Sequence, residues 1–187
     1  MVCRLESPTD IVYVYDQQSL PQGVSGNLLN DIANLITRMF KRFPEVRSGV
    51  LTQVDKSVAN LPIGLYRDEA HMKSELTTKQ DHNLPLMLVE LRTKSFHFNN
   101  GGRDVARKVA VLFINGILDN YKQLHQEAKR LKFNDNVEVF VVYFGTAITR
   151  DVKQIASYLT HDHVIHVTPG SDTESWTSAL LDQMCKI

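Results

Sequence analysis

The chain has 187 residues, and its 21 lysines and arginines balance 21 aspartates and glutamates, so the formal net charge at pH 7 is zero. A chain without net charge has no overall field that would draw it to nucleic acid or to an anionic membrane. The length fits one domain, spanning residues 1–187 with a core from about residue 9 to residue 185. We therefore expect a single domain whose partners are selected by local surface features.

Hydropathy and cysteine usage bear on the compartment. No apolar run approaches the ~18 residues of a membrane span, and the start, Met1-Val2-Cys3-Arg4, is not an apolar secretion signal. The chain is therefore either cytosolic or a domain cut from a longer secreted protein. Its two cysteines, Cys3 and Cys185, bracket the domain, and neither position is typical of a buried core thiol. We expect a disulfide that joins the termini, which would place the chain in an oxidising compartment; two free thiols are the alternative.

The first predicted element is a strand, Asp10–Asp16, whose five central residues are aliphatic or aromatic. After a loop with proline and glycine, apolar residues recur at helical spacing over 28–43 and predict a long helix, which Pro44 ends because helix interiors exclude proline. Two short runs, 48–54 and 57–65, predict strands. Because their two-residue connection is too short to join parallel strands, we expect an antiparallel hairpin at the sheet edge.

The second half of the chain continues the alternation of helices and strands. Residues 67–75 and 84–96 are expected to be helical, and 99–102 to form a glycine-rich loop. Two almost wholly apolar runs, 108–114 and 137–144, predict strands buried on both faces. The remaining predicted elements are helices over 121–131 and 152–159, a last strand over 164–167, and a final helix through Met184 that a Ser171–Glu174 capping box opens. The pattern predicts an α/β fold: a doubly wound, mostly parallel six-stranded sheet with one antiparallel edge strand and helices on both faces.

Polar residues follow two of the predicted strands at their carboxyl ends, where sheets of this type bind ligands. They are Asp16, Gln18 and Ser19 after the first strand, and Asn115, Gly116 and Asp119 after the central one. The first strand is not followed by the glycine-rich turn of a dinucleotide site, and no Gly-x-x-x-x-Gly-Lys motif is present. Ser19 has neither a nucleophile elbow nor a histidine placed to activate it. We therefore predict that the chain is not an enzyme.

Several segments of the chain together carry a family resemblance. They are 10–16, 101–103, 108–116 with Asp119, 137–140, 145–147, 155–157, 163–167 and the closing Cys185. On these residues the chain resembles a von Willebrand factor type A domain over nearly its full length. It is most similar to extracellular-matrix members. Thr78-Lys79-Gln80 together with 107–113 resembles a C-terminal A domain of a collagen VI alpha chain, and matrilin-like or invertebrate matrix proteins are also compatible.

The resemblance implies where a metal would lie, at the metal-ion-dependent adhesion site (MIDAS) of the family. Its motif is Asp-x-Ser-x-Ser, a distant threonine and an aspartate before the glycine that follows the central strand, and its oxygens hold a hard divalent cation. Here Asp16 is present, but Gln18 and Leu20 replace the serines, the threonine position falls near His82, and Asn115 replaces the second aspartate. We predict a degenerate site that holds no metal or other cofactor. Its remnants are Asp16, Gln18, Ser19, Asn115 and Asp119.

These observations predict a secreted, non-enzymatic module for protein–protein interaction and assembly in the extracellular matrix. Its partners would be other matrix proteins, collagenous chains or neighbouring A domains, without nucleic acid and without membrane insertion. The alternative is a cation-dependent adhesion domain that binds a matrix ligand through a metal held by Asp16, Ser19 and Asn115. A third interpretation, a cytosolic α/β enzyme, requires reduced cysteines.

A histidine cluster near the last strand allows two interpretations. His161, Asp162, His163 and His166 would suit a surface Zn²⁺ or Cu²⁺ site or a pH-sensitive patch, with His161 and His163 on one face if the segment is extended. We favour a polar loop that enters the strand, with His166 half buried.

Two other groups of residues could form contact surfaces. Lys122, Lys129, Arg130 and Lys132 would suit a heparin or collagen contact, but a solvated helix face explains them and is favoured. Phe96-His97-Phe98 would suit an aromatic hot spot for a protein partner, whereas we favour a pair of rings tucked under the sheet edge.

Overall fold

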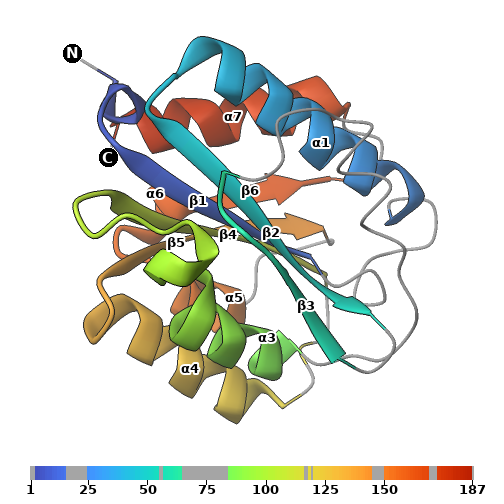
Figure 1. The fold of residues 1–187 in the computed structure, drawn as a ribbon. Coiled ribbons are helices and arrows are strands. Elements are labelled where there is room, and N and C mark those ends of the chain that lie inside the picture. Colours follow the sequence, from blue (N-terminus) through green and yellow to red (C-terminus); the bar gives the residue numbers. More distant parts are fainter. Residues whose placement is uncertain are drawn as a thin grey trace.

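The structure is a computed structural model that describes residues 3–15, 25–54, 57–64, 84–115, 118, 120–144, 150–168 and 172–186. A six-stranded sheet in the order β3-β2-β1-β4-β5-β6 forms its centre (Figure 1). The strands are β1 Thr9–Tyr15, β2 Val46–Val54, β3 Ser57–Leu61, β4 Arg107–Asn115, β5 Val137–Phe144 and β6 Val164–Val167. The helices are α1 Ser25–Arg42, α3 Leu84–Glu90, α4 Tyr121–Phe133, α5 Arg150–Ile155, α6 Thr160–His163 and α7 Thr173–Lys186. The sequence predicted this α/β architecture.

The order of the strands fixes where a ligand site belongs. β1 pairs in parallel with β2 on one side and with β4 on the other, and β4, β5 and β6 continue in parallel. β3 pairs with β2 in the antiparallel sense. The chain therefore winds outward in both directions from β1 and β4, and the crevice at their carboxyl ends is the switch point of the sheet.

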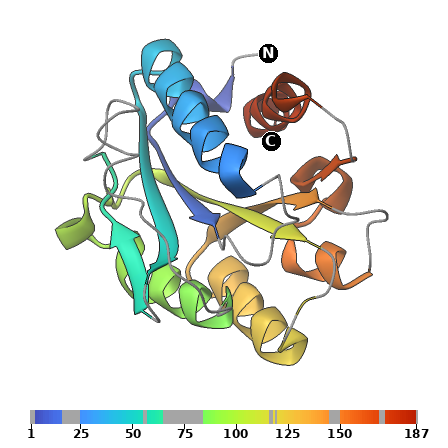
Figure 2. The same cartoon turned by 90° about the vertical axis from the view of Figure 1, so that its right-hand side faces the viewer.

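Helices cover both faces of the sheet and bury its two sets of strand side chains. α1 and α7 lie on one face, and α3, α4 and α5 lie on the other (Figures 1 and 2). Tyr13 and Phe113 belong to the apolar cluster under α1 and α7, whereas Val14 and Leu112, one residue along, belong to the cluster under α3 and α4. All seven residues of β1 are buried. A strand buried on both faces must be apolar at every interior position, and the sequence of β1 meets this requirement.

Some predicted boundaries differ from the structure. The helix predicted over 84–96 is α-helical only to Glu90 and continues as a π-helical turn, Leu91–Ser95. The helix predicted over 152–159 ends at Ile155. It ends there because the residues that follow bond to the edge of β5. β6 pairs with β5 only from Val141 onward. Before that residue, the backbone N–H of Ser157 donates to the carbonyl of Val139.

Two predicted features fall wholly or partly outside the described residues. The helix predicted over 67–75 lies outside them, as does Ser171 of the predicted capping box. Within the described part, the carboxylate of Asp172 accepts the backbone N–H of Ser175, 2.7 Å away. Asp172 therefore caps the start of α7, which begins at Thr173.

A buried ion pair fastens the start of β1 to the loop before β4. The Asp10 side chain is 1% exposed, and its carboxylate accepts the backbone N–H of Arg103 at 2.7 Å and the guanidinium Nε at 2.9 Å. The same guanidinium donates to the carbonyls of Thr9 and Glu45. A buried carboxylate is stable only when its oxygens are paired in this way. Asp10 is therefore a structural residue.

Two glycines immediately before Arg103 allow the backbone to pass close to neighbouring chain and place Arg103 in this position. Gly101 has a φ of 80°, and a Cβ on it would lie 2.1 Å from the carbonyl oxygen of Ile63. A Cβ on Gly102 would lie 2.1 Å from the carbonyl oxygen of Phe96. No other residue fits so close to neighbouring backbone, so the Gly101-Gly102-Arg103 segment has a structural explanation.

No helix within the described ranges is both long and apolar enough to cross a bilayer.

We predict that Asp10→Ala lowers the free energy of unfolding by about 3–5 kcal/mol, because it leaves the guanidinium of Arg103 without its buried partner. Urea denaturation of the two proteins measures the difference. Glu174→Ala is the matched control, since the Glu174–Arg38 pair is exposed and 3.6 Å long, and it should cost about 1 kcal/mol or less. Equal effects of the two substitutions would show that the buried pair does not hold the start of β1.

Candidate functional site

The switch point of the sheet contains one described member of the predicted metal site. Asn115 is the last residue of β4, is half buried, and pairs in register with Phe144 of β5. β4 lies next to β1, whose last residue is Tyr15. The other predicted members, Asp16, Gln18, Ser19 and Asp119, lie outside the described residues, as do Leu20 and His82. The degenerate metal site therefore stays a prediction.

Among the described residues, no three side chains of histidine, cysteine, aspartate or glutamate come close enough together to hold a metal ion.

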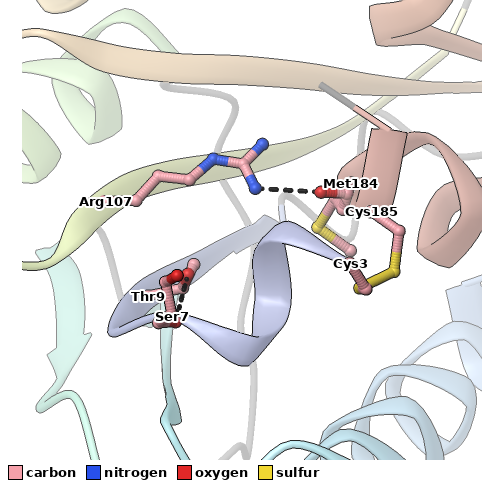
Figure 3. Close-up of a disulfide and its surroundings, with 6 residues drawn as sticks. All are labelled: Cys3, Ser7, Thr9, Arg107, Met184 and Cys185. Carbon is pink, nitrogen blue, oxygen red and sulfur yellow. Dashed lines mark hydrogen bonds between the residues drawn. A yellow bond between two sulfur atoms is a disulfide. The ribbon is translucent and has the colours of Figure 1, made fainter. Parts of the chain in front are cut away.

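The predicted disulfide is present. Cys3 and Cys185 are bonded across 182 residues of sequence, with their Cα atoms 4.4 Å apart, and the two chain ends lie side by side (Figures 1 and 2). In the chain-entropy account, closing so long a loop contributes about 5 kcal/mol to stability. Figure 3 shows a second fastening beside the disulfide, a 2.9 Å hydrogen bond from Nη1 of Arg107 to the carbonyl of Met184. The start of β4 and the end of α7 are thus held together.

The histidine cluster does not form a metal site among the described residues. The segment is helical, because α6 spans Thr160–His163, so the favoured prediction of a polar loop is wrong, and the condition for a shared face of His161 and His163, an extended segment, is not met. His161 is exposed and pairs with Asp162 at 3.1 Å, whereas the ring of His166, half buried as expected, stacks on Tyr143. His163 is buried. The three rings serve separate contacts.

His163 occupies a specific buried position. Its Nδ1 lies 2.8 Å from the carbonyl oxygen of Leu159, and its Nε2 lies 2.9 Å from Oε1 of Glu138. Both ring nitrogens thus face oxygen acceptors, and a ring that carries a proton on each nitrogen can donate to both. The ring also packs against Phe140, with centroids 4.7 Å apart.

Glu138 joins this histidine to Arg107. Its Oε2 accepts Nε of Arg107 at 2.7 Å, while Oε1 faces His163. Burial pushes the pKa of Glu138 upward, but the hydrogen bond with His163 and the charge and hydrogen bond of Arg107 outweigh it, so the pKa lies below its ordinary value. Burial lowers the pKa of Arg107, against the opposing attraction of Glu138. The resulting chain of contacts, from His163 through Glu138 and Arg107 to Met184, links α6, β5, β4 and α7.

Sequence reasoning did not single out Glu138 or Arg107. A usable signal was present, because Glu138 is the one charged residue in the apolar run 137–144. An ionised side chain at the start of an interior strand requires a partner.

The basic residues of α4 divide into two groups. Lys122 and Lys129 are exposed, as a solvated face requires, and Arg130 is also exposed while pairing with Glu127. Lys132 does not belong to that face. Its Nζ donates to the carbonyls of Gln154 and Ala156 at 2.7 and 2.8 Å, which satisfies the carboxyl end of α5. Burial lowers the pKa of Lys132 to about 8.

The two phenylalanines of Phe96-His97-Phe98, which follow the π-helical turn Leu91–Ser95, differ in their exposure. Phe96 is buried and 7% exposed, whereas Phe98 is 83% exposed. The favoured interpretation, two rings under the sheet edge, is right for Phe96 and wrong for Phe98. The physical reason is the short 3-10 turn Phe98–Asn100, which carries the second ring outward.

A comparison with known families decides the relationship. The von Willebrand factor type A domain profile matches residues 10–179. The chain belongs to the von Willebrand factor type A domain family. The match covers every strand of the sheet and extends into α7.

Individual relatives of this A-type domain are distant. Matrilin-1 of Mus musculus is 24% identical over 193 residues, which cover 98% of this chain and 38% of matrilin-1. Proximal thread matrix protein 1 of the mussel byssus is 18% identical, with a TM-score of 0.78 over 100% of this chain and 49% of that one. A second structure of the byssus protein has a zinc-occupied MIDAS motif and matches with a TM-score of 0.77, at 17% identity over 97% of this chain and 49% of that one. The chain thus spans less than half the length of these relatives, and the structural matches show the fold alone.

We predict that Glu138→Gln destabilises the domain in a pH-dependent way. Because the pKa of Glu138 is lowered in the folded state, its charged form contributes stability above the pKa of the unfolded chain, and this contribution is lost as the pH falls through the folded pKa. The substitution should cost about 1.5–3 kcal/mol near neutral pH, and the gap from wild type should narrow below about pH 4. Urea denaturation across the acid range measures it.

Glu45→Gln is the control for this prediction. The side chain of Glu45 is 52% exposed and lies 3.8 Å from Arg103, so its removal should change stability by about 1 kcal/mol or less at every pH. A gap for Glu138→Gln that stays constant into the acid range would contradict the role assigned to its charge.

Proposed function

We propose that this A-type domain is a secreted, non-enzymatic module for protein–protein interaction and assembly in the extracellular matrix. The observation that carries the proposal is the Cys3–Cys185 bond. Disulfides persist in oxidising compartments, whereas cytosolic thiols are kept reduced. The bond also holds the chain ends together, so that in a longer protein the domain would connect to its neighbours at one point. This geometry suits a domain in a tandem array.

The relatives support the matrix part of the proposal. One is matrilin-1, and the other is described as a thread matrix protein of the byssus. Because the chain spans 38% and 49% of these proteins, their activities as whole proteins carry over only as a proposal. We propose other matrix proteins, collagenous chains and neighbouring A domains as partners. A place in a collagen VI alpha chain is the narrower form of this proposal and rests on the sequence similarity over 78–80 and 107–113.

We further propose that the adhesion site is degenerate. A divalent cation such as Mg²⁺ requires a nearly complete shell of oxygens and compensating negative charge. Of the motif positions, Asp16 alone keeps a carboxylate, because Gln18, Leu20 and Asn115 are uncharged. Leucine supplies no ligand at all. The byssus protein, whose MIDAS motif holds zinc in one structure, has the same fold. Its motif positions can therefore be compared with those of this chain.

A cation-dependent adhesion domain is the second candidate function. It is favoured by the position of Asn115, which ends β4 next to β1, the strand that Asp16 follows in the sequence. Amide oxygens can ligate Ca²⁺, and Asn115 could therefore serve as a ligand. In this alternative, Asp16, Ser19 and Asn115 together hold the ion.

We predict that calorimetric titration of the wild-type domain with Mg²⁺ gives no saturable isotherm up to millimolar concentrations. The triple variant Gln18→Ser, Leu20→Ser, Asn115→Asp restores the motif residues at these positions and should gain saturable binding, because it supplies hydroxyl and carboxylate oxygens. A wild-type isotherm that disappears in Asp16→Ala would overturn the degenerate site.

We predict that the domain binds at least one matrix component and that EDTA leaves this binding unchanged. Biolayer interferometry against immobilised collagen VI and matrilin-1, each with Mg²⁺ and then with EDTA, measures it. The triple variant serves as the metal-competent control. Binding that EDTA abolishes would support the adhesion domain instead, and failure to bind either component would count against the proposed partners.

A further inference from the structure

A cleft of ≈ 850 Å³ lies at the end of the sheet where β4 and β5 begin, opposite the switch point. Three stretches of chain enclose it: 104–108 leading into β4, 132–138 between α4 and β5, and 153–160 around the end of α5. Its volume falls in the range of ligand-binding clefts.

Exposed apolar side chains line the cleft, one from each stretch. Val105 is 87% exposed, Phe133 is 75% exposed and Tyr158 is 90% exposed. Full burial of such a side chain is worth roughly 1.5–3 kcal/mol, and aromatic residues supply much of the energy of protein interfaces. Apolar groups from three separate parts of the sequence thus gather around one cleft, which is the arrangement expected of a docking surface.

The lining of the cleft is held rigidly by contacts already described. Arg107, Glu138 and His163 all line it and are bonded in a chain. Lys132 also lines it and is anchored by two backbone carbonyls. A site fixed before binding loses little conformational freedom when a partner arrives.

The charge of the lining favours an anionic partner. Its cationic residues are Arg4, Arg107, Lys108, Lys132 and Lys153, and its anionic residues are Asp104, Asp135 and Glu138. Glu138 and Arg107 neutralise each other, and the remaining cationic residues, Arg4, Lys108, Lys132 and Lys153, outnumber the remaining anionic ones, Asp104 and Asp135. An ammonium group has three donors, so Lys132 keeps one beyond the two that it gives to backbone carbonyls.

The mixture of groups identifies the kind of anion. A sulfated polysaccharide would leave the apolar rim unused, and the flat surface of an anionic membrane would not enter a concave cleft. A peptide supplies both apolar side chains and carboxylates within a few residues. We propose that this cleft binds an acidic peptide segment of a protein partner, with an apolar side chain between Phe133 and Tyr158 and a carboxylate beside Lys132 and Lys153.

The test is selection from random linear peptides displayed on phage, with the intact disulfide-bonded domain as bait. Enriched peptides should combine acidic with aromatic or aliphatic residues. A synthetic copy of one of them should bind roughly tenfold or more weakly to Phe133→Ser and to Tyr158→Ser. Lys153→Glu should weaken binding and reduce its dependence on salt.

Two matched variants control for general surface effects. Phe98→Ser removes an aromatic ring that is 83% exposed but does not line the cleft, and Lys122→Glu reverses an exposed charge of α4 outside it. Both should bind the peptide like wild type. All five substitutions are at exposed positions, and circular dichroism verifies that each variant is folded.

Several outcomes would overturn the proposal. They are a failure to enrich any peptide, enrichment of basic or uncharged peptides, and binding that the cleft variants leave unchanged. Concentration-dependent dimerisation of the wild type that Phe133→Ser abolishes would also overturn it, because the occupant would then be a second copy of this chain. The metal titration at the opposite end of the sheet is independent of all these results.

Discussion

The burial of β1 and β4 on both faces is the constraint on which the rest of the molecule depends. Helices cover the sheet from both sides, and the interior residues of these strands are wholly buried. No polar chemistry can take place along their length, because an unpaired polar group there would lose its hydration without compensation. Every group that binds, ionises or recognises a partner is therefore confined to the helix surfaces or to one of the two ends of the sheet.

The two ends use their polar residues differently. Where the strands begin, two largely buried carboxylates have partners: Asp10 is paired with Arg103, and Glu138 is paired with both Arg107 and His163. These contacts join segments far apart in the sequence, and the Cys3–Cys185 bond closes the same end. Where the strands finish, the polar residues belong to the proposed degenerate adhesion site, of which the structure describes Asn115. These two networks thus stabilise the end of the domain at which the disulfide joins the chain ends.

The sequence was sufficient to predict the sheet because its strands follow simple rules. β5 and β6 were predicted with their observed bounds, since both segments consist mostly of β-branched and aromatic residues, which favour strands. The terminal disulfide followed from the positions of two cysteines.

The polar network could not be predicted, because Arg107 and Glu138 are 31 residues apart and meet only through the pairing of β4 with β5. The segment after α5 was mistaken for helix because its apolar spacing continues, whereas Ser157 in fact completes the hydrogen bonding of Val139. Tertiary pairing overrode local pattern there.

The position of the cleft also depends on the segment after α5, which pairs with β5 and is not helical. Because β6 first pairs with β5 at Val141, the beginning of β5 extends past it, and the chain near Ser157 takes up that exposed edge. In this segment, Tyr158 is exposed at the surface, and His163, a few residues later, reaches Glu138. The same segment therefore contributes both an exposed and a buried residue to the lining of the cleft. Arg4, next to Cys3, lines the cleft as well, and Arg107 joins it to the last turn of α7. A partner held there would lie beside both chain ends, where neighbouring domains of a tandem array would meet. The proposed recognition at this end needs no cation, which agrees with the proposed matrix module and with the prediction of a degenerate adhesion site.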